Sequence, residues 1–308
     1  MNLKSLNIPV IDFVGRRKYA MIFSAILLIV SIASIGFQGL KFGIDFTGGT
    51  LIELGYEKTA DLEGIRSKLA SADFKGANVQ YFGSDTEVLI QLEPQSTSSA
   101  KLSSSIIRML GEGIDVRRVE FVGPKVGEEL TNDGGLAMLY ALIGILIYVA
   151  FRFEYRFALG SIAALVHDVI ITLGVFSLLQ IEFDLTVLAA ILAVIGYSLN
   201  DTIVVFDRIR ENFLATRQVE PGSIINEALN QTLSRTLMTS LTTLLVLFAL
   251  FYLGGEVIHS FAGALLIGVV IGTYSSIYVA SSTILAMGIS KEDMLPSEKE
   301  KKEIDARP

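Results

Sequence analysis

An aspartate lies inside an apolar segment of this sequence that is long enough to cross a membrane. Asp201 belongs to the stretch 196–212, GYSLNDTIVVFDRIREN, and lies about five residues, or ~8 Å, from the nearer end of its predicted span. An ionisable side chain in hydrocarbon costs roughly 2.5–3.5 kcal/mol on insertion scales, so it usually faces a bundle interior and has a function. We interpret Asp201 as a proton-binding carboxylate. The alternative is a carboxylate that is permanently paired and locks two helices together.

Polar side chains precede this aspartate in the same segment. Tyr197 and Ser198, four and three positions earlier, share its face of a helix and can hydrogen-bond its charged or neutral form. With Asn200 they make up a supporting polar face. This arrangement favours a carboxylate that gains and loses a proton.

A basic residue begins a later apolar segment. Arg235, in the stretch 234–243, SRTLMTSLTT, is the predicted partner of Asp201. Because charged groups inside a membrane tend to pair, relative motion of the two helices would make and break this contact and so load and unload a proton. The alternative is an arginine that reaches to the lipid headgroups and marks topology.

Two titratable residues, His167 and Asp168, fall near the middle of another predicted span, on neighbouring faces. Histidine changes its charge near neutral pH and can relay protons. Two interpretations stay open at this position: a proton relay, and a hydrogen bond within or between helices that only fixes packing.

A glycine-rich stretch, GIDFTGG at 43–49, follows the first apolar segment. Gly48 and Gly49 permit a tight or mobile turn, and Asp45 is placed to cap it. We predict a structural turn, with a hinge between two parts of the chain as the functional alternative. The stretch lacks the lysine and the helix context of a phosphate-binding loop, so we do not expect nucleotide binding.

The composition limits the classes of function. The 308 residues are 51% hydrophobic with mean hydropathy +0.56, which is typical of an integral membrane protein. A net charge of −7 argues against a nucleic-acid partner. The absence of cysteine excludes thiolate metal sites, and two histidines leave little for a metal cluster. No catalytic triad or paired-carboxylate arrangement stands out, so we expect no enzyme and no cofactor other than protons.

Six apolar segments match the length that crosses a hydrocarbon core of roughly 30 Å. They are 19–37, 135–151, 157–180, 185–206, 236–253 and 261–289. Basic residues precede the first span, and the loops 181–184 and 254–260 contain none. Because basic loops stay in the cytoplasm, we expect both the N-terminal segment 1–18 and the tail 290–308 inside, with 38–133 outside.

The external segment 38–133 has the patterns of a water-exposed domain. The predicted strands are 50–56, 78–82, 87–92 and 116–122, and the predicted helices are 61–70 and 99–110. The order β-α-β-β-α-β is that of a ferredoxin-like α+β domain. Residues 134–289 then form the remaining five transmembrane helices.

Taken together, the motifs of this chain resemble the SecD/SecF family of bacterial protein-export membrane proteins, on its SecF side. The resemblance covers almost the whole chain. The motifs are GIDFTGG at 43–49, VGPKVGEEL at 122–130, ALVHDVIITLG at 164–174, GYSLNDTIVVFDRIREN at 196–212, LSRTLMTS at 233–240 and GTYSSIYVAS at 272–281.

The resemblance implies a relative of resistance-nodulation-division pumps in the bacterial inner membrane. It implies a twelve-span base shared with SecD, which uses the proton-motive force to assist polypeptides after the SecA motor and the SecYEG channel have passed them, with YajC, YidC and lipids as further partners. It assigns the proton pathway to Asp201 and Arg235, with a further carboxylate from SecD, and no role to His167 and Asp168. Two alternatives remain: a half-transporter for small molecules or lipids, and a translocon scaffold that conducts nothing.

Overall fold

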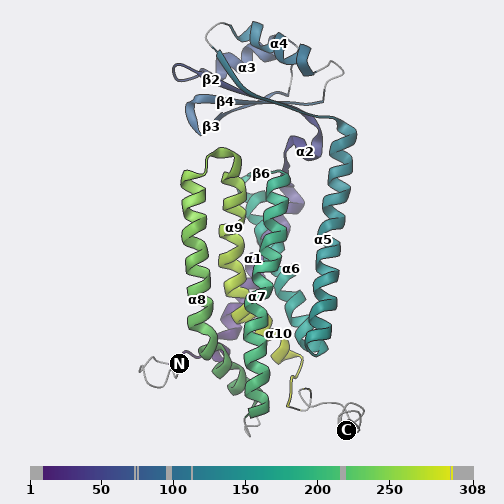
Figure 1. Ribbon diagram of the computed structural model, residues 1–308, viewed down its shortest axis with the longest axis vertical. Helices are drawn as coiled ribbons and strands as arrows, with labels where there is room; N and C mark the ends of the chain where they lie inside the picture. The colour runs from purple at the N-terminus through teal and green to yellow at the C-terminus, as the bar shows by residue number, and fades with distance from the viewer. Residues whose placement is uncertain are drawn as a thin grey trace, which may run out of the picture.

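The chain forms a bundle of long helices with a smaller sheet and two helices at one end (Figure 1). The computed structural model describes residues 10–72, 74, 76–94, 99–111, 114–215, 220–291 and 293. Within these residues, six helices are long and apolar enough to cross a membrane. They are α1 (Phe13–Gln38), α5 (Pro124–Arg152), α6 (Tyr155–Leu179), α7 (Leu185–Ala215), α8 (Pro221–Leu253) and the continuous run Glu256–Ala286. The predicted multi-pass membrane architecture is therefore confirmed.

The last of these helices is not uniform. It consists of α9 (Glu256–Ser275), a π-helical turn η2 (Ser276–Ala280) and α10 (Ser281–Ala286). A π-helical turn adds a residue to the turn and is frequently found at functional sites. The widened turn begins about two-thirds of the way along the run and changes the direction in which the following side chains leave the helix.

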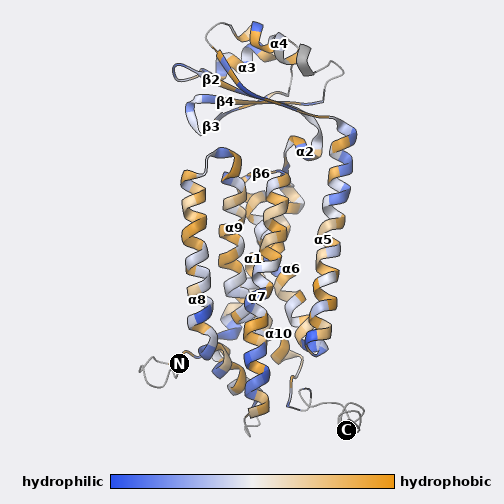
Figure 2. Ribbon diagram, viewed as in Figure 1, coloured by the Kyte–Doolittle hydropathy of each residue, from blue (hydrophilic) through white to orange (hydrophobic). Residues whose placement is uncertain are grey.

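Most helices extend beyond the apolar segments that predict them. Helix α5 begins at Pro124 and α8 at Pro221, each with proline in the first turn, where its missing N–H is not needed. Helix α1 begins after Asp12, whose side chain accepts a hydrogen bond from the Gly15 nitrogen at 2.7 Å. Hydropathy predicts the apolar part of a helix but not the polar residues that continue it. In Figure 2 these polar residues are the blue ends of the orange helices.

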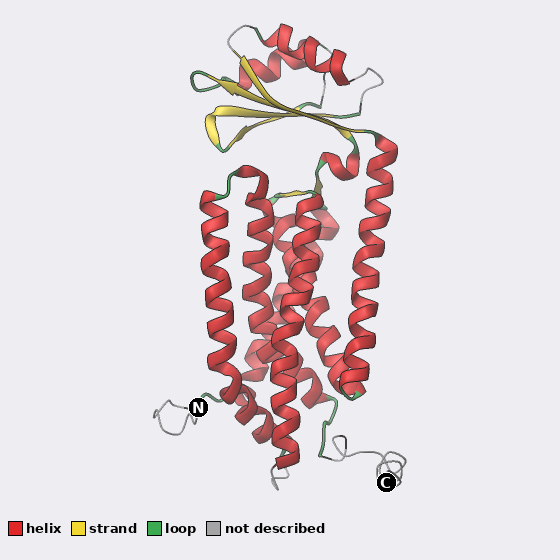
Figure 3. Cartoon of the chain, in the orientation of Figure 1, coloured by secondary structure: helices red, strands yellow, loops and turns green. Residues whose placement is uncertain are grey.

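The sheet and its two helices occupy residues 49–122, which we call the sheet domain (Figure 3). Its elements are β2 (Gly49–Tyr56), α3 (Leu62–Ser71), β3 (Asn78–Phe82), β4 (Ser84–Leu92), α4 (Ser99–Leu110) and β5 (Ile114–Val122). The strand order is β3-β4-β2-β5, and every neighbouring pair is antiparallel. This is the predicted order of strands and helices, with β4 three residues longer at its start than predicted.

The two parts of the molecule meet at a short parallel strand pair that was not predicted. Strand β1 (Lys41–Phe42) pairs with β6 (Glu182–Phe183), and a single helical turn α2 (Ile44–Thr47) follows β1. Two residues per strand are too few to show a periodicity, so hydropathy patterns could not reveal this contact.

Gly48 and Gly49 follow α2 at a tight turn, with φ of 71° and 140°. A Cβ atom on Gly49 would lie 2.4 Å from the carbonyl oxygen of Leu92, and one on Gly48 would lie 2.9 Å from Cα of Pro124. Only glycine fits both the backbone conformation and the space. The turn thus holds the sheet domain close to the start of α5, and its role as a hinge stays a prediction.

The helices α6, α7 and α9 form the interior of the bundle, while α1, α5 and α8 lie at its periphery and expose much apolar surface. Glycines allow α9 to approach α7 closely. A Cβ atom on Gly268 would lie 2.1 Å from the Val194 side chain, and one on Gly272 would lie 3.0 Å from the Ser198 side chain. This close approach brings hydroxyl side chains of α9 next to the acidic residues of α6 and α7.

Candidate functional site

Asp201, on α7, is 7% exposed, and hydroxyl groups from two other helices bind it. Thr236 of α8 donates to Oδ1 at 2.6 Å, and Ser276, the first residue of η2, donates to Oδ2. Each carboxylate oxygen therefore accepts a hydrogen bond from a neutral donor. These bonds join three helices at one buried carboxylate.

The predicted contact between Asp201 and Arg235 is not present. Arg235 forms no ion pair within 4.0 Å in the part of the chain that the structure describes, although it lies near enough to act electrostatically on Asp201. Successive residues of a helix point about 100° apart. Thr236 therefore faces the bundle, and Arg235 is turned to the exposed side of α8.

The predicted polar face around Asp201 is divided between different environments. Ser198 donates to Asp168 at 2.6 Å, not to Asp201. The Tyr197 hydroxyl is buried without a hydrogen-bond partner among the described residues, and Asn200 is exposed. The expectation that all three support Asp201 is wrong, because α7 turns Ser198 toward α6.

His167 and Asp168, on α6, form a second buried site, at 3% and 1% exposure. The His167 Nδ1 and Asp168 Oδ1 atoms are 2.9 Å apart, so the two residues contact each other. Asp168 Oδ2 also accepts hydrogen bonds from Ser198 at 2.6 Å and Ser275 at 2.7 Å. On its other side, His167 Nε2 lies 3.2 Å from the Ser24 hydroxyl of α1.

Three consecutive residues at the junction of α9 and η2 connect these sites. Tyr274 bonds to Ser24, Ser275 to Asp168 and Ser276 to Asp201. We call the whole set the hydroxyl network; its members are Ser24, His167, Asp168, Ser198, Asp201, Thr236, Tyr274, Ser275 and Ser276. Sequence reasoning missed Ser24, Thr236, Tyr274, Ser275 and Ser276. The last four lie within the motifs 233–240 and 272–281, which were the available signal.

The chemistry of the hydroxyl network is that of proton binding. Carboxylate, imidazole and hydroxyl groups all donate or accept protons, and burial makes each unsatisfied group costly. Among the described residues, no group of three or more His, Asp or Glu side chains could hold a metal ion. The side chains of the network are therefore groups that can donate and accept protons.

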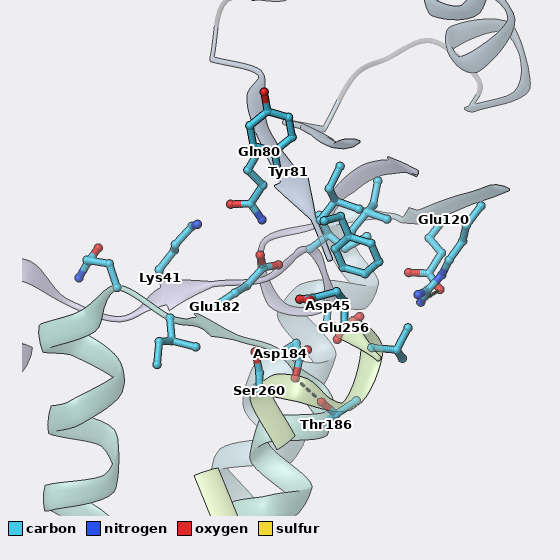
Figure 4. Close-up of a pocket in the computed structure, with 18 of the residues that line it drawn as sticks. Lys41, Asp45, Gln80, Tyr81, Glu120, Glu182, Asp184, Thr186, Glu256 and Ser260 are labelled. Carbon is cyan, nitrogen blue, oxygen red and sulfur yellow. Dashed lines mark hydrogen bonds and ion pairs between the residues drawn. The ribbon is translucent and has the colours of Figure 1, made fainter. Parts of the chain in front are cut away.

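A cleft between the sheet domain and the bundle is the second candidate functional site (Figure 4). This sheet cleft has a volume of about 400 Å³ and is lined by the acidic residues Asp45, Glu120, Glu182, Asp184 and Glu256, with Lys41 and Arg118 among them. Arg118 is paired with Glu120. The remaining carboxylates give the cleft a negative character.

Two of these acids, Asp45 and Glu182, bind residues of other elements. Asp45, predicted to cap the glycine turn, instead accepts a hydrogen bond at 2.9 Å from the backbone nitrogen of Leu185, the first residue of α7. Glu182 accepts a hydrogen bond from Gln91 of β4 at 2.7 Å. Burial raises the pKa of the Glu182 carboxyl above its ordinary value, and this outweighs the Gln91 hydrogen bond and the Lys41 charge, which lower it.

Comparison with known proteins gives consistent results. The family model of the SecD/SecF GG motif matches residues 33–60, and that of the C-terminal part of the protein export membrane proteins SecD/SecF matches residues 103–290. The protein translocase subunit SecF of Vibrio alginolyticus is 55% identical over 305 residues, which is 97% of both chains. The SecF subunit of Pseudomonas aeruginosa is 47% identical over the full length of both chains.

A solved structure is also similar. The crystal structure of SecDF from Thermus thermophilus, described as a translocon-associated membrane protein, matches with a TM-score of 0.83 and 40% identity. The match covers 91% of this chain and 39% of the SecDF chain. Most of the hydroxyl network and the glycine turn fall within the two ranges matched by the family models.

Proposed function

Because this chain belongs to the SecD/SecF family, among its SecF protein translocase subunits, we propose that it works with SecD to assist polypeptide export with the proton-motive force. In this proposal the complex acts in the bacterial inner membrane beside the SecYEG channel. YajC and YidC are further proposed partners. Protons are the coupling ion, and Asp201 binds them.

The observation that carries the proposal is the setting of Asp201. Its carboxylate is buried in the bundle, and both of its oxygens accept hydrogen bonds from hydroxyl groups rather than from a cation. A carboxylate locked by an ion pair would resist protonation, whereas a hydroxyl can reverse its role and accept a hydrogen bond from the acid. Asp201 can therefore gain and lose a proton when two helices shift.

The face of α7 and α8 beside Asp201 is where we place SecD. Ala189, Ala193 and Gly196 of α7 are exposed at helical spacing, as is Arg235 of α8. Small residues let another transmembrane helix approach closely. A carboxylate of SecD on this face would pair with Arg235, and the two subunits would form a twelve-span base.

The orientation in the membrane follows from the basic side chains. Arg152, Arg156, Arg208 and Arg210 lie near the bundle end opposite to the sheet domain. Because basic segments stay in the cytoplasm, we place both termini there. The sheet domain is then a ferredoxin-like periplasmic domain, on the side where the translocating polypeptide emerges.

The energy available limits the mechanism. One charge that moves through 100 mV gains about 2.3 kcal/mol. Shifting a two-state equilibrium from 1:99 to 99:1 takes about 5.5 kcal/mol. The cycle therefore uses more than one proton or a smaller conformational difference.

Reconstitution with SecD and the channel tests the proposal. Asp201→Asn should abolish the export stimulated by a membrane potential, and the proton flux with it, while the subunits still co-purify. Asp207→Asn is the matched control, because Asp207 lies on the same helix and pairs with Arg152 at 2.8 Å near the bundle end. Native flux and export in the Asp201→Asn complex would reject the proposal and leave the scaffold role.

A further inference from the structure

The hydrogen bonds around His167 determine where its protons lie. Tyr274 donates its only hydroxyl hydrogen to the carbonyl oxygen of Ala20 at 2.6 Å. The 3.0 Å contact between the Ser24 and Tyr274 hydroxyls must then use the hydrogen of Ser24. Ser24 consequently has only its lone pairs left for His167, 3.2 Å away. The Nε2 atom of His167 therefore carries a hydrogen.

The opposite side of the imidazole holds a second proton. Asp168 Oδ2 accepts hydrogen bonds from Ser198 and Ser275, and Asp168 Oδ1 lies 2.9 Å from His167 Nδ1. Without a proton between Nδ1 and Oδ1, two lone pairs would face each other in a buried site. With that proton on either atom, the pair has no net charge. His167 and Asp168 thus hold two protons between them, one at Nε2 and one shared.

We propose that the His167–Asp168 pair is a second proton-binding site of this bundle, which exchanges one proton through Ser24 and Tyr274. The inference rests on the proposed function, because it adds a site to the same proton-coupled cycle. In this step the Nε2 proton passes to Ser24, the Ser24 hydrogen passes to Tyr274, and the Tyr274 hydrogen leaves to a water molecule. The pair then has one negative charge, on Asp168, and both hydroxyls point back toward His167.

The groups around the pair are consistent with this path. Tyr274 is half-buried and is the last member of the hydrogen-bonded series His167–Ser24–Tyr274; the centre of the Tyr278 ring lies 5.3 Å from the centre of the Tyr274 ring. Asp201 of α7 accepts a hydrogen bond from Ser276, the neighbour of Ser275, and Arg235 of α8, next to Thr236 in the sequence, is exposed. In the described ranges, no lysine or arginine forms an ion pair with Asp168, whose charge-bearing partner is His167.

Adjacent serines couple this pair to Asp201. Ser275 and Ser276 are consecutive residues, and each has a second acceptor in its own helix. Ser275 lies 3.1 Å from the Gly272 carbonyl oxygen, and Ser276 lies 3.1 Å from that of Thr273. When a carboxylate is charged, its serine donates to it. When the carboxylate takes up a proton, the serine can turn its hydrogen to the helix carbonyl and accept from the acid.

The start of the π-helical turn lies at this point of the chain, between Ser275 and Ser276. Any shift of the turn moves both serines together, because they are neighbours on one backbone. Proton uptake at Asp201 should therefore change the hydrogen bonding of Asp168. The two sites then bind protons in a linked way, although no hydrogen bond joins them directly.

Nitrogen NMR of ¹⁵N-histidine tests the pair without any transport assay. The chain has two histidines, and His259 provides an internal reference, since its Nδ1 lies 3.0 Å from the Phe251 carbonyl oxygen. In the complex with SecD, we expect a protonated Nε2 on His167 and a clear shift of its Nδ1 signal in Asp168→Asn. Ser34→Ala should leave both signals unchanged, because Ser34 joins α1 to α6 only through Ser177, at 2.8 Å. An unprotonated Nε2, or no response to Asp168→Asn, would overturn the inference.

The same signals test the coupling. Asp201→Asn and Ser276→Ala should each shift the His167 resonances, while Asp207→Asn should not. Unshifted His167 signals in both network variants would refute the link to Asp201.

Proton flux in proteoliposomes then separates the inference from the proposed function. Asp168→Asn and Tyr274→Phe should each lower the flux by roughly a hundredfold, the low end of the effect of a positioned acid or base, while Ser34→Ala keeps the native rate. If both variants conduct normally while Asp201→Asn does not, the second site is refuted and the proposed function stands. If Asp201→Asn itself conducts normally, the proposed function fails, and the NMR result still decides whether the pair binds a proton.

Discussion

Acidic side chains lie in two different settings in this molecule, the hydroxyl network and the sheet cleft. In the hydroxyl network, Asp168 and Asp201 are almost fully buried, and hydroxyl groups bind every carboxylate oxygen that His167 does not. In the sheet cleft, of about 400 Å³, five acids share an open space with two basic residues. The residue types are the same, but the partners and the access of water differ.

This difference determines what each setting can sense. Inside the bundle, the carboxylates bond to hydroxyl groups of several helices, so under the proposed function their proton occupancy would depend on the relative position of those helices. In the cleft, the acids share an open space with Lys41 and Arg118, and burial raises the pKa of Glu182. We infer that the network is suited to energy coupling and the cleft to holding the sheet domain on the bundle.

Removing one hydroxyl of the network should have a larger effect than any change in the cleft. Thr236→Val keeps the shape of the side chain but removes the donor to Asp201 Oδ1. A hydrogen bond to a charged group contributes about 1.5–3 kcal/mol, so potential-driven proton flux should fall by roughly 10- to 100-fold. Flux measured in proteoliposomes with SecD checks this.

Thr242→Val on the same helix is the control. Its hydroxyl bonds only to backbone carbonyls of its own helix, at Met238 and Thr239, and its side chain is exposed. Equal proton flux in the two variants would mean that the Thr236 hydroxyl bonded to Asp201 does not matter for proton flux. The proposed difference between the network and the cleft would then be wrong.

A smaller effect is expected at the glycine turn, which lies in the sequence between the cleft residues Asp45 and Leu51. Gly49→Ala places a methyl group 2.4 Å from the Leu92 carbonyl oxygen at a φ of 140°, so the turn must shift. Strain of this kind costs about 1–3 kcal/mol. Limited proteolysis should then cut the sheet domain faster than in the native chain. Gly36→Ala in α1 is the control: its added methyl group has no neighbouring atom within 4 Å, so the cleavage rate should not change. If both variants are cleaved as slowly as the native chain, the turn is not tightly constrained.

Sequence patterns predicted the parts of the fold that depend on local periodicity. The six apolar helices and the alternation of strands and helices in residues 49–122 follow from the spacing of apolar residues. The pairing of β1 with β6 did not follow, because it joins two-residue strands that are 141 positions apart.

The site was harder to predict because it also joins residues that lie far apart in the sequence. Hydropathy identified Asp201, His167 and Asp168 as unusual in lipid, but it does not show which helices are neighbours. The groups that bind Asp201 are 35 and 75 residues away in the chain. Thr236, which bonds to Asp201, directly follows the predicted partner Arg235, and one residue along a helix changes the face by about 100°.

The smallest expected effect concerns the cleft acid that contacts both parts of the molecule. Burial raises the pKa of Glu182 above its ordinary value of 4.5, so the folded state binds this proton more tightly than the unfolded state. Stability from this group is therefore fully present below pH 4.5 and is lost as the pH rises through the raised value. Glu182→Gln removes that loss, since the amide stays neutral and can still accept a hydrogen bond from Gln91.

Thermal unfolding at acidic and neutral pH measures the difference. Glu182→Gln should match the native melting temperature at acidic pH and exceed it at neutral pH, whereas the exposed Glu57→Gln should show no such pH-dependent gain. A variant that melts lower than the native chain at neutral pH would mean that the charged form of Glu182 stabilises the cleft. The acids of the cleft would then hold the sheet domain through their charge, and the response to solution pH would run in the opposite direction from the one that burial predicts.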